Sequence, residues 1–219
     1  MPDEPPVITT TFPCMPARQC SVFVAVLLLT ACHQKEAPKP VVVPQVFRVQ
    51  FQTSQGDFVV EATRAWAPHG VDRFHELVQM KYFDQGRVFR VVPGFIAQFG
   101  VHRDFNVHEK WRTMFIADDP PQQKNLRGTL AFAKSDPGTR ATEIFVNLAD
   151  NKALDDQGFV PFAKVIQGMD VVDKFYSGYG EMRPEGKYID PTRVEGEANE
   201  YLVQRFPNLD FIRHAEFLP

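Results

Sequence analysis

From Gln45 onward the chain consists of short apolar runs separated by turn residues, and this pattern limits the fold more than any other feature. Residues 47–52 alternate between apolar and polar types. Successive side chains of a strand point to opposite faces, so this alternation is typical of a half-buried β-strand. The turn signal at 54–57 separates it from a second strand expected over 58–63. The folded part is therefore predicted to begin with a β-hairpin.

The rest of the pattern is similar in character. Helical spacing after Pro68 predicts one amphipathic helix, and a short second helix is expected near 169–176. In the tail, helical spacing over 198–206 predicts a helix that ends at Pro207. Further strands are expected at 88–92, 95–99, 128–133, 142–148 and 159–166. Many short strands with few helices favour a β-sandwich or barrel, with the polar stretch 100–127 as an ordered excursion.

Residues 1–31 are predicted to be a signal peptide. The apolar run 21–31 follows Arg18 and is about half as long as the roughly 20 residues that span a bilayer. Acidic residues near the first methionine favour Met15 as the true start of translation. The run ends in Leu29-Thr30-Ala31-Cys32, which resembles a bacterial lipobox, whose cysteine is lipidated and becomes the first mature residue. An ordinary cleaved signal that contains a cysteine is the alternative.

All three cysteines lie at or before Cys32. The folded region therefore has no thiol for a disulfide, a nucleophile or a cysteine metal site. Residues 32–44 are polar and proline-rich, and we expect an extended tether between the membrane and the domain. His33 stands where an aspartate would retain some lipoproteins at the inner membrane. This favours the periplasmic face of the outer membrane as the location.

The chemistry open to the folded region is limited. A net charge of −3 gives no reason to expect nucleic acid as a partner. No serine after Cys32 lies in a nucleophile elbow, and no histidine pair has metalloprotease spacing. For His102 and His108, solvated loop histidines are favoured over a shared site. Gly178-Tyr179-Gly180 lacks the rest of a phosphate-binding fingerprint and is interpreted as a loop turn. We predict neither a metal nor a cofactor.

Arg90 is the exception in an otherwise apolar run over 88–92. A permanent charge in such a run needs water or a partner. The pattern alone favours an arginine that points outward from an exposed barrel face. A functional arginine is the alternative.

The residues around Arg90 resemble the signature segment of cyclophilins. From Tyr82 to Gln98 the chain has an aromatic-Asp turn, then arginine, two aliphatic residues, Pro-Gly-Phe, an aliphatic, one variable residue and glutamine. Further matching blocks follow in the family's order at 128–133, 142–146, 154–155, 162–165 and 168–172. The resemblance covers about 46–176, and the tail from Ser177 resembles that of a bacterial subgroup.

The resemblance implies a mainly β fold, a closed eight-stranded antiparallel barrel capped by two α-helices. The isomerase domain is expected over 45–180, with a C-terminal helical extension over 181–219 packed on the barrel. It also implies a peptidyl-prolyl cis–trans isomerase that accelerates X–Pro amide rotation during folding. Because of the predicted anchor, we expect envelope proteins as its substrates, and we expect a monomer. The alternative is a proline-peptide-binding or chaperone-like module with weak or no isomerase activity.

By the same resemblance, Arg90 matches the catalytic arginine. Gln98 matches a residue that helps to place arginine and substrate, and the backbone of Lys134 lies where substrate peptide is held. The full set of expected substrate-binding residues is Phe95, Ile96, Gln98, Lys134, Glu143, Phe145, Leu154 and Phe159.

Three positions depart from the family's pattern. Glu143 replaces a glutamine, so a carboxylate is expected near Arg90, where it would either orient the arginine or compete with substrate for it. Phe159 replaces a histidine and makes the pocket rim more apolar. Ala153 stands where many relatives have an aromatic residue, which is expected to weaken binding of cyclosporin.

Overall fold

The computed structural model describes residues 42–184 and 188–219. The predicted signal peptide, the lipidation site at Cys32 and the tether up to residue 41 lie outside the described residues. Within the part that is described, no helix combines the length and the apolar content that crossing a bilayer requires.

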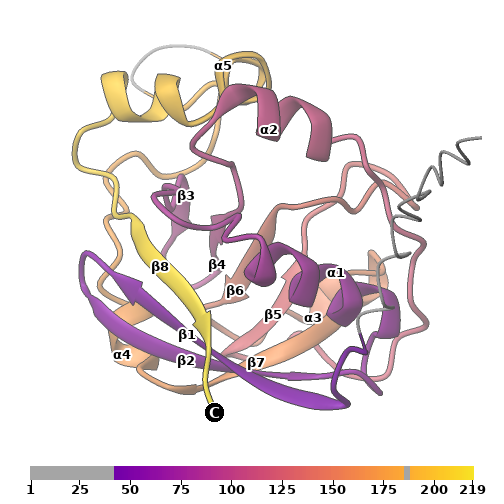
Figure 1. The fold of residues 1–219 in the computed structure, drawn as a ribbon. Helices are drawn as coiled ribbons and strands as arrows, with labels where there is room; N and C mark the ends of the chain where they lie inside the picture. The colour runs from indigo at the N-terminus through magenta and orange to yellow at the C-terminus, as the bar shows by residue number, and fades with distance from the viewer. Residues whose placement is uncertain (1–41, 185–187) are drawn as a thin grey trace, which may run out of the picture. The chain divides into compact units, whose positions relative to one another are not determined.

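Eight antiparallel strands form one sheet with the spatial order β3-β4-β6-β5-β7-β2-β1-β8 (Figure 1). The strands are β1 (Val46–Thr53), β2 (Gly56–Thr63), β3 (Arg90–Val92), β4 (Ile96–Phe99), β5 (Thr129–Phe132), β6 (Ile144–Asn147), β7 (Pro161–Gln167) and β8 (Ile212–Phe217). The predicted hairpin is confirmed, because β1 and β2 pair along their whole length. Gly56 closes its turn with a φ of +122°, which glycine adopts readily because it has no Cβ.

The described residues form five helices, where two capping helices and one helix in the C-terminal tail were expected. They are α1 (Pro68–Gln79), α2 (Phe105–Trp111), α3 (Lys152–Asp156), α4 (Met169–Val172) and α5 (Pro191–Arg205). The predicted helix after Pro68 is confirmed as α1, which buries its apolar side in the main core. Helix α2 forms inside the polar excursion. Asp104 caps its first turn by accepting hydrogen bonds from two backbone N–H groups.

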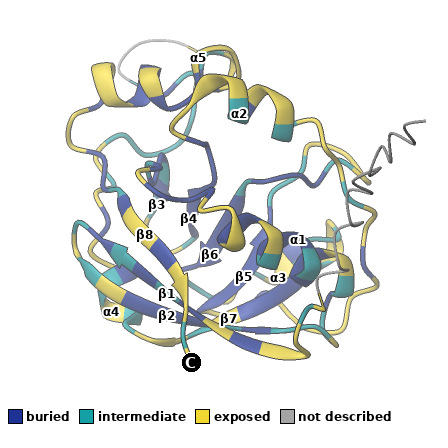
Figure 2. Ribbon diagram, in the orientation of Figure 1, coloured by how far each residue is buried: buried dark blue, intermediate teal, exposed yellow. Residues whose placement is uncertain are grey.

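The central strands β4, β5 and β6 are buried on both faces (Figure 2). On one face, Ala97 and its partners across the ladder, Leu130 and Val146, belong to the main hydrophobic core. On the other, Ile96, Ala131 and Phe145 form a separate small cluster with Leu154. Because side chains alternate along a strand, each of these strands places one set of residues in the core and the next set on the opposite face.

The last part of the chain both packs on the sheet and extends it. Helix α5 contributes Tyr201 and Leu202 to a second buried cluster and lies beside α2 (Figure 1). The predicted helix in the tail is confirmed, and it ends before Pro207. Strand β8, which was not predicted, then pairs antiparallel with β1. The sheet therefore includes residues beyond 180, where the isomerase domain was expected to end.

The two outer strands of the sheet show how far the barrel prediction holds. A mainly β fold with eight antiparallel strands is confirmed. Within the described residues, β3 and β8 share no ladder with each other. The segments that precede them meet at one bridge, Arg87↔Phe211, and Ile212 donates to the Gly86 carbonyl at 3.0 Å. Closure of the barrel stays a prediction.

Candidate active site

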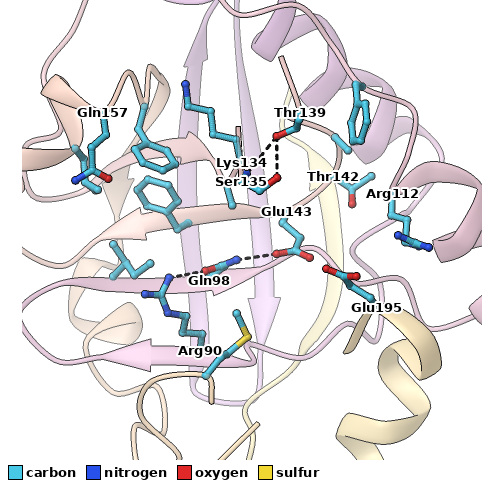
Figure 3. A pocket seen from close by; sticks show the side chains of 18 of the residues that line it. Arg90, Gln98, Arg112, Lys134, Ser135, Thr139, Thr142, Glu143, Gln157 and Glu195 are labelled. Atoms are coloured by element: carbon cyan, nitrogen blue, oxygen red, sulfur yellow. Dashed lines mark hydrogen bonds between the residues drawn. The ribbon is translucent and has the colours of Figure 1, made fainter. Parts of the chain in front are cut away.

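One cleft of about 570 Å³ brings together every residue predicted for catalysis or substrate binding (Figure 3). Its lining includes Arg90, Phe95, Ile96, Gln98, Lys134, Glu143, Phe145, Leu154 and Phe159. Their proximity is a property of the fold, whereas their individual roles stay predictions.

Strand pairing sets Arg90 and its partners in one row. Arg90 on β3 lies opposite Gln98 on β4, and Gln98 lies opposite Phe145 on β6. Opposed residues share a face of the sheet. Since Val91 and Ala97 belong to the core, their neighbours Arg90 and Gln98 turn to the cleft. The arginine that pattern alone placed on an exposed face is therefore only 20% exposed.

Acceptors hold the Arg90 guanidinium on two sides. Its Nη1 donates to Gln98 Oε1 at 3.0 Å. Its Nε and Nη2 donate to the two carboxylate oxygens of Glu181, the second at 2.9 Å. The guanidinium carbon also lies 5.7 Å from the centre of the Phe95 ring, within the range of a cation–π contact. The hydrogen bonds from Arg90 hold the pKa of Glu181 below its ordinary value.

Gln98 lies between Arg90 and Glu143. Its Nε2 donates to Glu143 Oε2 at 2.7 Å (Figure 3). Because arginine can only donate, the amide oxygen of Gln98 must face Arg90 and its nitrogen must face the carboxylate. Glu143 therefore lies near Arg90 but is joined to it through Gln98, and within the described chain the carboxylate that forms an ion pair with Arg90 belongs to Glu181.

The two carboxyl groups have opposite pKa shifts. Burial raises the pKa of Glu143 to about 7, and the nearby Glu195 carboxylate adds to the rise, whereas the Gln98 hydrogen bond and Arg90 oppose it. Glu143 therefore changes charge near neutral pH. Glu181, with its lowered pKa, remains ionised there.

An apolar floor lies beside Arg90. Ile96, Phe145 and Leu154 are buried, and Phe95 and Phe159 pack against them. The rings of Phe145 and Phe159 meet edge to face, with centroids 5.7 Å apart. A hydrophobic floor next to an oriented donor suits a ligand that combines an apolar ring with a hydrogen-bond acceptor.

Lys134 covers the edge of this floor. Its Nζ lies 5.6 Å from the centre of the Phe159 ring and 3.8 Å from an oxygen of Asp118. The prediction concerned only the backbone of Lys134. The structure adds that its side chain is 8% exposed and lines the cleft.

The other end of the cleft is polar, and most of its residues were not predicted from the sequence. His108 comes from α2, Arg112 follows the last residue of that helix, and Glu195 comes from α5. The interpretation of His102 and His108 as solvated is wrong, because both are buried. Burial lowers the pKa of His108 to about 4, so this side chain is neutral at physiological pH. The helix cap at Asp104 was the signal that could have revealed α2.

Glu181 and Met182 were also missed. They follow the turn at 178–180, and no motif in the sequence connects them with Arg90. In the described residues, no group of three or more His, Cys, Asp or Glu side chains is arranged to hold a metal ion. What the cleft offers is an oriented cation, hydrogen-bonding groups and an apolar floor.

Known proteins resemble this chain in both sequence and fold. Residues 48–195 match the family described as cyclophilin type peptidyl-prolyl cis-trans isomerase/CLD. A peptidyl-prolyl cis-trans isomerase of Acinetobacter baylyi is 35% identical over 132 residues, which cover 58% of this chain and 70% of the relative. Peptidyl-prolyl cis-trans isomerase B of Escherichia coli is 31% identical over 134 residues, with coverage of 58% and 82%.

Solved structures support the fold. A cyclophilin type peptidyl-prolyl cis-trans isomerase of Cryptosporidium parvum matches with a TM-score of 0.57 and 18% identity, over 80% of this chain and 98% of that one. A crystal structure under the same description, in the presence of the dipeptide Ala-Pro, matches with a TM-score of 0.55 and 18% identity, over 78% and 99%.

Proposed function

The chain belongs to the cyclophilin-type peptidyl-prolyl cis–trans isomerases, a family of enzymes, and we propose that its cleft around Arg90 is where X–Pro amides rotate. One observation carries the proposal: Arg90 is a fixed donor beside an apolar floor. Among the described residues, Gln98 and Glu181 together take three of its five N–H groups, which leaves two for a substrate.

The reaction needs no bond between the enzyme and its substrate. Rotation about an amide has a barrier of about 18–20 kcal/mol, because the C–N bond has partial double-bond character. In the twisted state the proline nitrogen loses conjugation and its lone pair can accept a hydrogen bond. An N–H of Arg90 would make that bond only in the twisted state, so it would stabilise the transition state more than the ground state.

The apolar floor would bind the proline ring of the substrate beside Arg90. Phe95, Ile96, Phe145, Leu154 and Phe159 would receive the proline ring and keep water away from Arg90. Electrostatic interactions strengthen where water is excluded. The relative crystallised in the presence of Ala-Pro supports an X–Pro segment as the ligand class. We therefore expect proline-containing polypeptides to bind across this floor.

A protease-coupled assay on several X–Pro peptides tests the proposal. We expect Arg90→Ala to lower kcat/KM about 100-fold, the order of magnitude for losing one donor aimed at a transition state. Arg48→Ala is the matched control, because it removes a 56% exposed arginine of β1 that does not line the cleft. If the wild-type domain left the isomerisation rate of the peptides at its value in buffer, the proposed enzymatic function would be refuted. If that domain still bound the peptides, a proline-peptide-binding module would be the better description.

For the cellular location, we propose that Cys32 is lipidated and that residues 32–44 tether the domain to the periplasmic face of the outer membrane. The support is the lipobox-like run at 29–32 and the proline-rich composition after it. Substrates would then be proline-containing envelope proteins. Labelled palmitate should enter the full chain and a Cys20→Ser control but not Cys32→Ser. Label that persists in Cys32→Ser would contradict the anchor.

A further inference from the structure

We infer that Glu181 is a positioning residue for Arg90, supplied by the C-terminal extension. The inference rests on the proposed function, because it concerns how Arg90 is aimed at the substrate. It gives a role at the cleft to a segment that the sequence predicts only to pack on the barrel.

The geometry of the pair fixes the guanidinium plane. Glu181 accepts from Nε and from Nη2, while Gln98 accepts from Nη1 on the other side. A carboxylate that engages two N–H groups of one arginine sets its orientation as well as its charge. Any rotation of the guanidinium would break at least one of these bonds. The two remaining N–H groups of Arg90 therefore point in defined directions.

The Glu181 carboxylate is itself held by its surroundings. Tyr179 packs edge to face on Phe206, with centroids 4.9 Å apart, and Phe206 belongs to the buried cluster of α5. Gly180 then turns the chain with a φ of +62°, where glycine is favoured. The backbone N–H of Met182 donates to Glu181 Oε1 at 3.2 Å. This loop thus connects the packing of the extension with Arg90.

Exposure argues that the pair matters more for orientation than for stability. The Glu181 side chain is 42% exposed and that of Arg90 is 20% exposed. Ion pairs open to water contribute little to folding. In the opposite role, Glu181 would withhold Arg90 from substrate. The hydrogen bonds do not favour this role, because two N–H groups of Arg90 stay available for a substrate while Gln98 and Glu181 hold the other three.

Steady-state kinetics of the full chain test the inference. Glu181→Gln keeps the size of the side chain but offers one acceptor oxygen and no charge. We expect kcat to fall about tenfold, the order of magnitude for a small misplacement of a catalytic group, with KM nearly unchanged. Glu181→Asp keeps the charge but has a side chain shorter by one methylene. Its kcat should therefore lie between those of the wild type and Glu181→Gln.

Glu197→Gln is the matched control. Glu197 forms the same two-bond pair with Arg193 on α5, at 2.7 and 2.9 Å, but does not line the cleft. Its kcat should equal that of the wild type. In addition, the NMR signal of the Arg90 Nε–H group should move in Glu181→Gln and stay in place in Glu197→Gln.

A double variant shows whether Glu181 acts through Arg90. In an Arg90→Ala background, Glu181→Gln should cause no further loss of rate, because residues that act as a unit are not additive. An unchanged or higher kcat in Glu181→Gln alone, with active wild type, would overturn the positioning role and leave the proposed function standing. An inactive wild type would overturn both.

Discussion

The two regions that meet at Arg90 are built by different means. Strands β3, β4 and β6 place Arg90 and Gln98 through backbone register, in a continuous ladder. The tail from Ser177, which includes the extension over 181–219, places Glu181 through aromatic packing and a single turn. The donor is thus set by the sheet, but its direction depends on a residue 91 positions further along the chain.

The two carboxyl groups that flank Arg90 and Gln98 differ in the same way, one lying beside the sheet and the other in the extension. Glu143, just before β6, is half-buried, and burial raises its pKa to about 7. Glu181, from the extension, has a lowered pKa because Arg90 donates to it. The sheet side therefore carries a group that titrates near neutrality, and the extension carries one that stays charged.

The largest effect should follow from breaking the sheet side at Phe145. Its ring is 2% exposed and lies at the centre of the small cluster beneath the cleft. Phe145→Ala should lower the free energy of unfolding by about 3–5 kcal/mol, since it leaves a cavity. Urea unfolding measures this. Phe217→Ala, at a ring that is 37% exposed, should cost much less. Equal losses in the two variants would argue against a tightly packed floor.

A smaller effect should follow from loosening the extension at Tyr179. Tyr179→Ala removes the ring that holds the loop on Phe206, so kcat should fall about tenfold, as for Glu181→Gln. The unfolding free energy should change by about 1 kcal/mol, because the ring is only partly buried. Tyr179→Phe keeps the ring and should behave as wild type. A normal kcat in Tyr179→Ala would show that the loop does not depend on this contact.

The two carboxyl groups should also differ in how they make stability depend on pH. The folded pKa of Glu143 lies above its ordinary 4.5, so the fold favours the protonated form. Wild type should therefore lose stability as the pH rises from about 4.5 to about 7, and the loss should then level off. Glu143→Gln should lack this slope and be the more stable protein at pH 8. Glu181 has the opposite sign: its small contribution is lost as the pH falls.

Thermal unfolding of wild type and Glu143→Gln across this pH range checks the difference. The sharper comparison is with Glu181→Gln, which should differ from wild type at neutral pH and converge with it in acid. Parallel curves for wild type and Glu143→Gln would mean that Glu143 is better solvated than its position indicates.

The part of the site that lies on strands could be predicted from the sequence. Its two signals, the period-two alternation and the blocks that resemble the family, are each carried by residues that are close together in the chain. Arg90, Gln98 and Phe145 lie on such strands, and the structure brings them into one row. Glu181 could not be predicted, since its position depends on how α5 and Phe206 pack. His108 was misjudged because a polar stretch was taken to be solvated, whereas α2 buries it. Strand β8 was missed because its pairing with β1 joins opposite ends of the described chain.

A crystal structure of this chain with a bound X–Pro peptide tests the central claim most directly. The account predicts the proline ring on the floor formed by Phe95, Phe145 and Leu154. It predicts the free N–H groups of Arg90 on the side of the X–Pro amide, with Glu181 still bonded to the guanidinium. A peptide bound elsewhere, or one that displaces Glu181 from Arg90, would contradict it.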